Sequence, residues 1–399
     1  MKSPKVRFRG YTDDWEERKL GDIAEFSKGR GYSKSDLTDV GISIILYGRL
    51  YTKYETSISE VDTFVTPKNG SVYSKGGEVI LPASGETAKD IARAATVKNA
   101  GVLLGGDLNI VTPDSTINSI FLALSISNGT SQKELVKKAQ GNSVVHIHNE
   151  EIKALTIPFP SRIEQNRIAN YFSNLDNLIT LHQRKCEEIK ILKKYMLQKM
   201  FPQNGMNVPE IRFDGFTDAW EQHKFGDLGF VSMCKRIFKE QTSPEGDIPF
   251  YKIGTFGGEP DAFISRELYE EYKGKFQYPE VGDLLISASG TIGRIVEYNG
   301  EDAYFQDSNI VWFKHDKKVD NSFLKCIYAF VKWSGIEGST IKRLYNDNFL
   351  KTEFWMPIVE EQAKIGAYFR SLDNIITLHQ QKCDELQSIK TFMLQNMFV

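Results

Sequence analysis

EQNRIANYFSNLDNLITLHQRKCEEIKILKKYMLQKMF, residues 164–201, returns at 361–398 with 22 of its 38 positions identical. In both copies apolar side chains recur at alternating spacings of four and three, the heptad pattern of a coiled coil. The first copy contains neither Gly nor Pro, and Pro160 and Pro202 flank it. We therefore predict one long helix from each copy, roughly 57 Å long. The seam of the first copy is Ile168, Phe172, Leu175, Ile179, His182, Cys186, Ile189, Lys193, Met196 and Met200.

The rest of the chain is also written twice. Residues 5–22 return at 210–227 with ten of eighteen positions identical. Between this opener and the helix the halves share only short islands, which are 76–85 with 281–290, 107–111 with 307–311, and 141–152 with 338–349. Such a duplication predicts a pseudo-twofold molecule whose two helices pack antiparallel. The alternative is that each helix packs only on its own globular region.

The two globular regions mix strand and helix patterns. Segments rich in β-branched residues predict strands at 42–48, 77–85, 108–113, 283–290 and 308–314. Segments that begin at Asn-Ser and end at Gly predict helices at 118–129 and 321–335. The predicted fold is α+β, with two globular domains separated by two long antiparallel coiled-coil helices. The predicted boundaries are 1–155, 156–205, 206–352 and 353–399.

Composition restricts the class of protein without assigning it a function. The 399 residues are 26% charged and 41% hydrophobic, which excludes a disordered chain. No apolar run approaches the roughly 20 residues of a membrane helix, and no secretory signal opens the sequence. Four cysteines lie far apart, so we expect a reduced, cytoplasmic protein. The net charge of −2 argues against a simple nucleic-acid binder, so any DNA contact must come from locally placed charge or a partner.

The heptad seam is interrupted by His182 with Cys186 and, in the second copy, by His379 with Cys383. Two such pairs could meet as a Cys2His2 zinc site. We favour the simpler interpretation of a semi-polar layer that fixes helix register, so no metal is predicted.

Two further pairs of repeated residues allow more than one interpretation. Lys193 and Lys390 also fall on the seam, where they either mark an opening for partner helices or extend their ammonium groups past the seam to water. Trp15 and Trp220 lie in the repeated opener, and we expect them to be core anchors rather than base-stacking residues.

Motifs for covalent chemistry are missing from the sequence. The amino-methyltransferase motif with its Pro-Pro pair, the Walker A loop, GxSxG and HExxH do not occur. His146 and His148 alternate within one predicted strand, which places both on one face rather than in a metal site. We therefore predict no catalytic residues and a chain that is not an enzyme.

The repeated order of motifs resembles the specificity subunit of a type I restriction–modification system. W-E-x-x-K-[LF]-G-D stands at 15–22 and 220–227. P-x-x-x-E-Q-x-x-I begins at Pro160 and Pro357, and Y-F-x-x-L-D-x-x-I-T-L-H-Q-x-K-C stands at 171–186 and 368–383. No single motif is specific, but their duplicated order covers essentially the whole chain.

The resemblance implies a non-catalytic subunit whose globular regions are target-recognition domains, each reading one half of a bipartite, asymmetric sequence in double-stranded DNA. It implies two methyltransferase subunits and two restriction subunits as partners, and no membrane. S-adenosylmethionine, ATP and Mg²⁺ would belong to those partners, and this chain would hold no cofactor. The helices would set an unread gap of roughly 5–7 bp, since modules on one face of B-DNA engage half-sites about one turn apart. A duplicated coiled-coil scaffold without DNA readout is the alternative.

Candidate base-reading residues are polar positions that flank the shared islands and differ between the halves. Arg pairs with guanine O6 and N7, and Asn or Gln with adenine, so such positions can give two half-sites on one scaffold. In the first half the candidates are Lys28, Arg30, Tyr32, Lys34, Arg49, Thr87, Lys89, His146 and His148. In the second half they are Lys235, Arg236, Lys239, Thr255, Thr291, Arg294, Arg343 and Tyr345.

Overall fold

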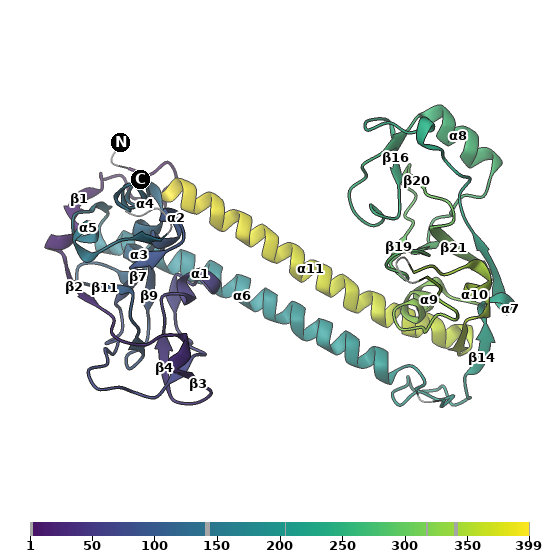
Figure 1. The fold of residues 1–399 in the computed structure, drawn as a ribbon, viewed down its shortest axis with the longest axis horizontal. Coiled ribbons are helices and arrows are strands. Elements are labelled where there is room, and N and C mark those ends of the chain that lie inside the picture. The colour runs from purple at the N-terminus through teal and green to yellow at the C-terminus, as the bar shows by residue number, and fades with distance from the viewer. Residues whose placement is uncertain (1–2, 140–143, 204, 317, 339–341, 399) are drawn as a thin grey trace. The chain divides into compact units, whose positions relative to one another are not determined.

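The computed structural model describes residues 3–139, 144–203, 205–316, 318–338 and 342–398 (Figure 1). It divides into two compact units, Met1–Arg184 with Gln380–Val399, and Lys185–His379. Each unit therefore combines one globular region with parts of both long helices. The four boundaries predicted along the chain remain predictions, because the two units divide the helices differently.

The first unit is built on a five-stranded sheet in the order β2-β11-β7-β9-β5 and a four-stranded sheet in the order β10-β4-β6-β3. Two short pairs, β1-β13 and β12-β8, complete it. Its strands are β1 (Glu16–Lys19), β2 (Ala24–Lys28), β3 (Leu37–Thr38), β4 (Ile42–Ile45), β5 (Ser57–Ile58), β6 (Phe64–Val65), β7 (Val79–Pro82), β8 (Ser84–Gly85), β9 (Ala95–Val97), β10 (Leu103–Leu104), β11 (Leu108–Pro113), β12 (Val145–His146) and β13 (Thr156–Phe159). Its helices are α1 (Arg49–Thr52), α2 (Ala88–Ile91), α3 (Ser119–Ser127), α4 (Gly129–Lys138), α5 (Asn149–Lys153) and the start of α6 (Arg162–Lys199).

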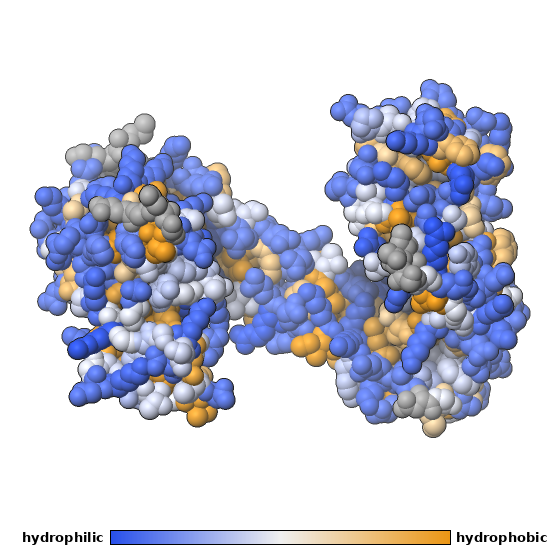
Figure 2. All heavy atoms as spheres, viewed as in Figure 1, coloured by the Kyte–Doolittle hydropathy of each residue, from blue (hydrophilic) through white to orange (hydrophobic). Residues whose placement is uncertain are grey.

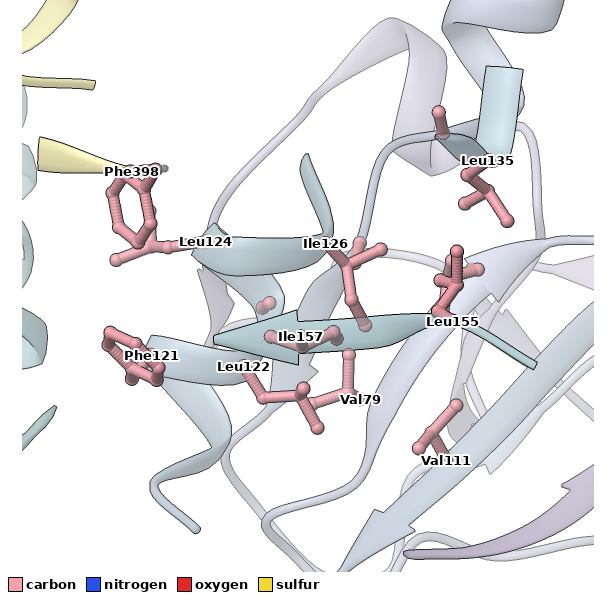
Figure 3. Packing of buried hydrophobic residues seen from close by; sticks show 14 of the residues in the cluster. Val79, Val111, Phe121, Leu122, Leu124, Ile126, Leu135, Leu155, Ile157 and Phe398 are labelled. Atoms are coloured by element: carbon pink, nitrogen blue, oxygen red, sulfur yellow. The ribbon is translucent and has the colours of Figure 1, made fainter. Parts of the chain in front are cut away.

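The core of the first unit lies between its five-stranded sheet and α3. Val79 and Val111 from the sheet and Leu122 from α3 are fully buried in one cluster. The cluster also includes Phe398, which follows the last residue of α11 (Val359–Met397). Figure 3 shows the Phe398 ring beside Phe121 and Leu124, and the two rings lie 6.0 Å apart between centroids. The end of the chain is therefore part of the core of its first globular region.

The second unit repeats this plan with fewer strands. Its sheets have the orders β15-β21-β18-β19, β17-β16-β20 and β14-β22. The strands are β14 (Glu221–Lys224), β15 (Gly229–Ser232), β16 (Ile248–Tyr251), β17 (Phe263–Ile264), β18 (Leu284–Ser287), β19 (Ile295–Glu297), β20 (Tyr304–Phe305), β21 (Ile310–His315) and β22 (Glu353–Met356). The helices are α7 (Phe225–Leu228), α8 (Arg266–Lys275), α9 (Asn321–Tyr328), α10 (Asn346–Lys351) and parts of α6 and α11. Phe201, just after α6, lies in the core at 5.6 Å from the ring of Phe323.

The repeated Glu-Gln pair explains why opener and helix recur together. Glu164 is 1% exposed and binds the Arg7 guanidinium through both oxygens, at 2.7 and 2.8 Å. In the second unit Arg212 binds Glu361 in the same way, at 2.7 Å for both contacts. These carboxylates raise the pKa of Arg7 and Arg212. The hydroxyl of Ser161 accepts from the backbone N–H of Glu164 at 3.4 Å, while the Glu164 carboxylate is occupied by Arg7.

The glutamine of each pair joins its long helix to the start of a helix in the globular region, α3 in the first unit and α9 in the second. Gln165 accepts a hydrogen bond from the backbone N–H of Asn118 at 2.9 Å and donates to the carbonyl of Pro160 at 3.0 Å. Gln362 accepts from Asp320 and donates to Pro357 in the same arrangement. Asn118 and Asp320 are the N-caps of α3 and α9. The P-x-x-x-E-Q motif is thus a buried polar junction whose hydrogen-bonding groups are paired.

Each repeated opener docks on the last turn of a long helix. The first opener, residues 5–22, contacts α11, and the second, residues 210–227, contacts α6. In the first unit the N–H of Val6 donates to the carbonyl of Asn396 at 3.0 Å, in the last turn of α11. In the second unit the N–H of Ile211 donates to the carbonyl of Lys199 at 2.9 Å. The two contacts are repeat counterparts, so both units are closed by the same backbone bond.

Antiparallel pairing of α6 with α11 is confirmed inside each unit. In the first unit Asp176 forms an ion pair with Lys390, and in the second unit Lys193 forms one with Asp373. The two seam lysines therefore bind carboxylates across the helix pair, which neither sequence interpretation named. Cys383 and Cys186 are buried and lie 3.7 and 4.0 Å from the carbonyl oxygens of Ile179 and Ile376 on the opposite helix.

Most sequence expectations about local structure are confirmed, with one helix too long. Trp15 and Trp220 are each 2% exposed and lie in the cores. The helix predicted to reach Gly335 ends at Tyr328. Beyond it Trp333 stacks on Phe225, and the N–H of Ser334 donates to the hydroxyl of Thr352, so side-chain and tertiary contacts replace the helix. Residues 140–143 and 339–341, which include part of the third island, lie outside the described residues.

Candidate nucleic-acid interface

In the first unit the shared islands meet at one end of the five-stranded sheet. β8 pairs with β12, which places His146 opposite Ser84. The side-chain amide of Asn109, at the start of β11, donates to the carbonyl of Ile147 at 2.9 Å. Lys28 is the register partner of Asn109 at the end of β2. We call Lys28, Ser84, Asn109, His146 and His148 the first edge.

The first edge presents cationic and imidazole groups on an ordered backbone. The side chains of Lys28, His146 and His148 are exposed, and the two imidazole rings stack at 6.4 Å between centroids. Gly85, next to Ser84, permits close packing here, because a Cβ would lie 2.4 Å from the Ile91 side chain. The hydroxyl of Tyr51 donates to the carbonyl of Ser84 from below, and burial raises the pKa of Tyr51.

Thr87 and Lys89 lie at the start of α2, which follows β8 of the first edge. Thr87 is the N-cap of α2, where its hydroxyl accepts from the N–H of Asp90 at 3.2 Å. Both side chains are exposed. The helix thus follows directly from β8, and the structure brings together Lys28, Thr87, Lys89, His146 and His148 from separate parts of the sequence.

The second unit repeats the same edge with other side chains. Ser289 bridges Arg343, and its hydroxyl donates to Asn309 at 2.8 Å. The N–H of Leu344 donates to the carbonyl of Ala288 at 2.8 Å. We call Met233, Ser289, Asn309, Arg343 and Tyr345 the second edge. With Asn346 and Asp347 these residues line a cavity of about 330 Å³, whose other lining residues are Ala288, Ser308 and Leu344.

Both edges contain a residue in the left-handed backbone region, which is unusual for non-glycine residues. These are Asp107, with φ of 57°, and Ser308, with φ of 52°. Ser308 directly precedes Asn309, and Asp107 lies two residues before Asn109. Strained backbone of this kind is concentrated at functional sites.

Three first-half candidates lie elsewhere in the first unit, around the four-stranded sheet. The hydroxyl groups of Tyr32 and Ser71 are 2.5 Å apart, and the Lys68 ammonium lies 4.9 Å from the Tyr32 ring centroid. Arg30 and Lys34 are exposed nearby in the chain. These residues are not part of the first edge, so a DNA contact from them would be a separate one.

The Arg49 side chain is buried in ion pairs within the first unit. It is 8% exposed and forms ion pairs with Asp62 at 2.6 Å and Glu55 at 2.8 Å. Lys53 first and then Arg49 lower the pKa of Asp62 to about 2. The guanidinium fixes α1, from which Tyr51 supports the first edge. The DNA contact predicted for Arg49 is untested, and breaking these ion pairs is expected to lower stability.

The other second-half candidates do not gather into one site. Arg236 forms an ion pair with Asp307 at 2.8 Å, and Lys235 lies 5.1 Å from the Phe276 ring centroid. Arg294 donates to the carbonyl of Phe256 at 2.7 Å, next to Thr255. Thr291 follows Ser289 and Gly290 in the chain and is exposed, and Lys239 is exposed in a short 3₁₀ helix.

Sequence reasoning missed five residues of the two edges, which are Met233 and four residues shared between the halves. Ser84, Ser289, Asn109 and Asn309 are identical in the two halves, so a search for positions that differ does not select them. Their hydrogen bonds show that they position the variable residues. Asp347, whose counterpart is Glu150, was also missed, because its lack of a side-chain partner among the described residues is not visible in the sequence.

The described residues do not include a group of three or more His, Cys, Asp or Glu side chains that could hold a metal ion. Within the same described ranges, no helix combines the length and apolar character needed to cross a bilayer. That the His-Cys pairs of the seam bind no metal remains a prediction from the sequence. The two edges present hydrogen-bond donors and acceptors on a backbone that is itself held by hydrogen bonds.

Comparison with known proteins assigns the chain to a family. The model of the type I restriction modification DNA specificity domain matches residues 12–191 and again 217–388. The chain belongs to the type I restriction–modification specificity family. Each matched segment contains one globular region with most of its long helix, which is the duplicated order seen in the sequence. Specificity subunits are the DNA-recognition, non-catalytic members of type I restriction–modification systems, and this chain is one of them.

Relatives of this specificity subunit share sequence or fold across much of its length. A protein of Haemophilus influenzae assigned as a type I restriction enzyme specificity subunit is 38% identical over 277 residues, which are 68% of this chain and 69% of the relative. The MjaVIII specificity subunit of Methanocaldococcus jannaschii is 21% identical and covers 95% of this chain and 90% of its own. The crystal structure of the S subunit from M. genitalium matches 100% of this chain and 99% of its own with a TM-score of 0.64, at 15% identity.

Proposed function

We propose that this subunit reads a bipartite, asymmetric DNA sequence, with one half-site for each globular region. The observation that carries the proposal is the pair of edges. Their backbones are held by equivalent bonds, but His146 and His148 occupy the positions that Arg343 and Tyr345 occupy in the second unit. Different donors and acceptors on one scaffold select different base edges in the major groove.

The long helices supply the second part of the proposal, which is the docking of two methyltransferase subunits. Leu181 and its counterpart Leu378 are 47% and 63% exposed on the faces turned away from the helix pair. Tyr195 and Phe392 are another exposed counterpart pair, at 47% and 56%. Figure 2 shows apolar residues among hydrophilic ones along the helices. Repeated exposed apolar side chains on a helix favour partner helices.

The chemistry then belongs to the partners. The methyltransferases would transfer a methyl group from S-adenosylmethionine to an adenine, and two restriction subunits would supply ATP- and Mg²⁺-dependent translocation and cleavage. This chain would act in the cytoplasm without a cofactor of its own. Because its net charge is −2, the partners would supply much of the contact to phosphates, while the edges supply base readout. We expect an unread gap of roughly 5–7 bp, about the spacing for modules on one face of B-DNA.

Long-read methylation mapping tests this proposal. DNA would come from cells that express this chain with a cognate methyltransferase subunit, and assembly of the complex would be verified by co-purification. We expect one bipartite motif carrying N6-methyladenine, absent from cells with the methyltransferase alone. A purified complex that methylates no motif would instead support the scaffold function.

A further inference from the structure

The cavity at the second edge is lined by two opposite charges, Arg343 and Asp347, whose side chains form no ion pair with another described residue. Neither has a side-chain hydrogen-bond partner among the described residues. They also do not pair with each other. Since a carboxylate and a guanidinium on one site normally bind one another, their separation leaves donors and an acceptor available for a third molecule.

The Arg343 backbone is fixed, so its side chain starts from a defined position. Its N–H donates to the carbonyl of Glu337 at 2.7 Å, and its carbonyl accepts from the N–H of Glu337 at 3.0 Å. Ser289 bridges it on the other side, and Gly290 donates to the carbonyl of Lys342 at 3.0 Å. A pre-organised anchor lowers the entropy cost of binding and sharpens selection.

Asp347 also lines the cavity, and α10 fixes its backbone. It lies in the first turn of this helix, whose later residue Asn348 donates to the carbonyl of Gly335 at 2.6 Å. The same cavity is also lined by Ser308 and by Met233, which adds an apolar surface. The site therefore combines a planar double donor, one anionic acceptor and an apolar wall.

A single base pair displays the complement of this set. In the major groove a G·C pair shows two acceptors, O6 and N7 of guanine, next to one donor, the N4 amino group of cytosine. An A·T pair lacks two adjacent acceptors on one base. Because the proposed function makes DNA the ligand of this edge, the donor and acceptor pattern identifies the base pair.

We propose that the second unit reads a G·C base pair, with Arg343 donating to guanine O6 and N7 and Asp347 accepting from cytosine N4. The first unit lacks this combination. Its counterpart of Arg343 is His146, and its counterpart of Asp347 is Glu150, which forms an ion pair with Lys153 at 2.7 Å. This inference rests on the proposed function and adds the base pair and the two residues that select it.

The test is the methylation rate of the complex of this chain with its methyltransferase on a library of DNA targets. The library starts from the wild-type motif and replaces each position of both half-sites in turn. We expect Arg343→Ala to lose roughly 5- to 150-fold discrimination at one G·C pair of one half-site, with the other half-site unchanged. Asp347→Asn should lose discrimination at the same pair. Arg343→Lys should retain only part of it, because Lys lacks the bidentate fork.

Lys342→Ala is the matched control, since this exposed neighbour alternates to the other side of the extended segment. It should leave the motif unchanged. The inference is overturned by an active Arg343→Ala complex that keeps all its discrimination, that relaxes both half-sites, or that relaxes an A·T pair. A wild-type complex with no bipartite motif would instead overturn the proposed function, so the two failures are distinct.

Discussion

The first and second edges differ in their exposed side chains and agree in the backbone bond that holds them. The N–H of Ile147 donates to the carbonyl of Ala83 at 3.0 Å, and the N–H of its counterpart Leu344 donates to the carbonyl of Ala288 at 2.8 Å. The exposed positions differ in charge and shape, with His146 in one edge and Arg343 in the other. Recognition can therefore change in one unit without loss of the bonds that fold it.

The same separation holds through the scaffold. Arg7 with Glu164 and Arg212 with Glu361 are duplicated with the same atoms bonded. Buried polar junctions allow few alternatives, because an unpaired buried charge is costly. Exposed edge positions carry no such constraint. The comparison thus predicts large stability effects at shared residues and large sequence-preference effects at variable ones.

The largest stability effect is expected at the buried ion pairs. Arg7→Ala and Arg212→Ala each leave a buried carboxylate without its partner, which costs about 3–5 kcal/mol. Urea unfolding should show a similar loss for both variants if the two junctions are equivalent. Arg18→Ala is the control, because Arg18 pairs with Glu16 on the surface and should change stability by less than about 1 kcal/mol. Similar small losses in all three variants would break the comparison.

A second prediction links the end of the chain to its first globular region. Phe398→Ala removes a buried ring from the core beside Phe121 and should cost about 3 kcal/mol or more. Hydrogen exchange should then rise in α3 of the first unit rather than in α9 of the second. Phe201→Ala should raise hydrogen exchange in α9 rather than in α3. The substitution Gln395→Ala, at an exposed position, should raise it in neither helix. Loss of protection in the same unit for both Phe variants would contradict the cyclic docking of openers and helix ends.

Alkaline pH should weaken the second unit through two buried thiols. Burial raises the pKa of Cys234 and Cys326 to about 12. An unfolded thiol ionises near pH 8.5 while the folded one does not, so each stabilises the unfolded state as pH rises above about 8.5. At pH 9.5 this amounts to about 1.4 kcal/mol per thiol. Denaturant unfolding at pH 7 and 9.5 should show the loss in the wild type and a smaller one in Cys234→Ala. An equal loss in both proteins would remove the thiol from the explanation.

The smallest effects are expected at the cross-helix ion pairs. Lys390 is 15% exposed and Lys193 29%, so the pair with Asp176 in the first unit should be the stronger. Double-mutant cycles should give coupling energies of about 0.2–1 kcal/mol, falling at high salt. A larger coupling for Lys193 with Asp373 would reverse this order.

Sequence alone predicted the elements that depend on repetition and periodicity. The heptad seam is confirmed in the buried residues Ile168 and Phe172 and in their counterparts Ile365 and Phe369. The bond from Val6 to Asn396 could not be predicted, because a contact between residues so far apart leaves no periodic signal.

The candidate site was predicted in part for a similar reason. Choosing residues that flank the shared islands placed His146 and Arg343 on the edges, because the islands pair with one another. It also selected Arg49, whose carboxylate partners Glu55 and Asp62 are not marked by any pattern. Asp347 escaped because a carboxylate is recognised as a base reader only once its lack of a partner is visible.

The most direct test of two different edges on one scaffold is methylation mapping of two single variants beside the wild type. The complex containing His146→Ala should relax one half-site of the motif, and the complex containing Arg343→Ala should relax the other. The unaltered half-site should be retained in each case. Relaxation of the same half-site by both variants, or of neither by two active complexes, would contradict the account.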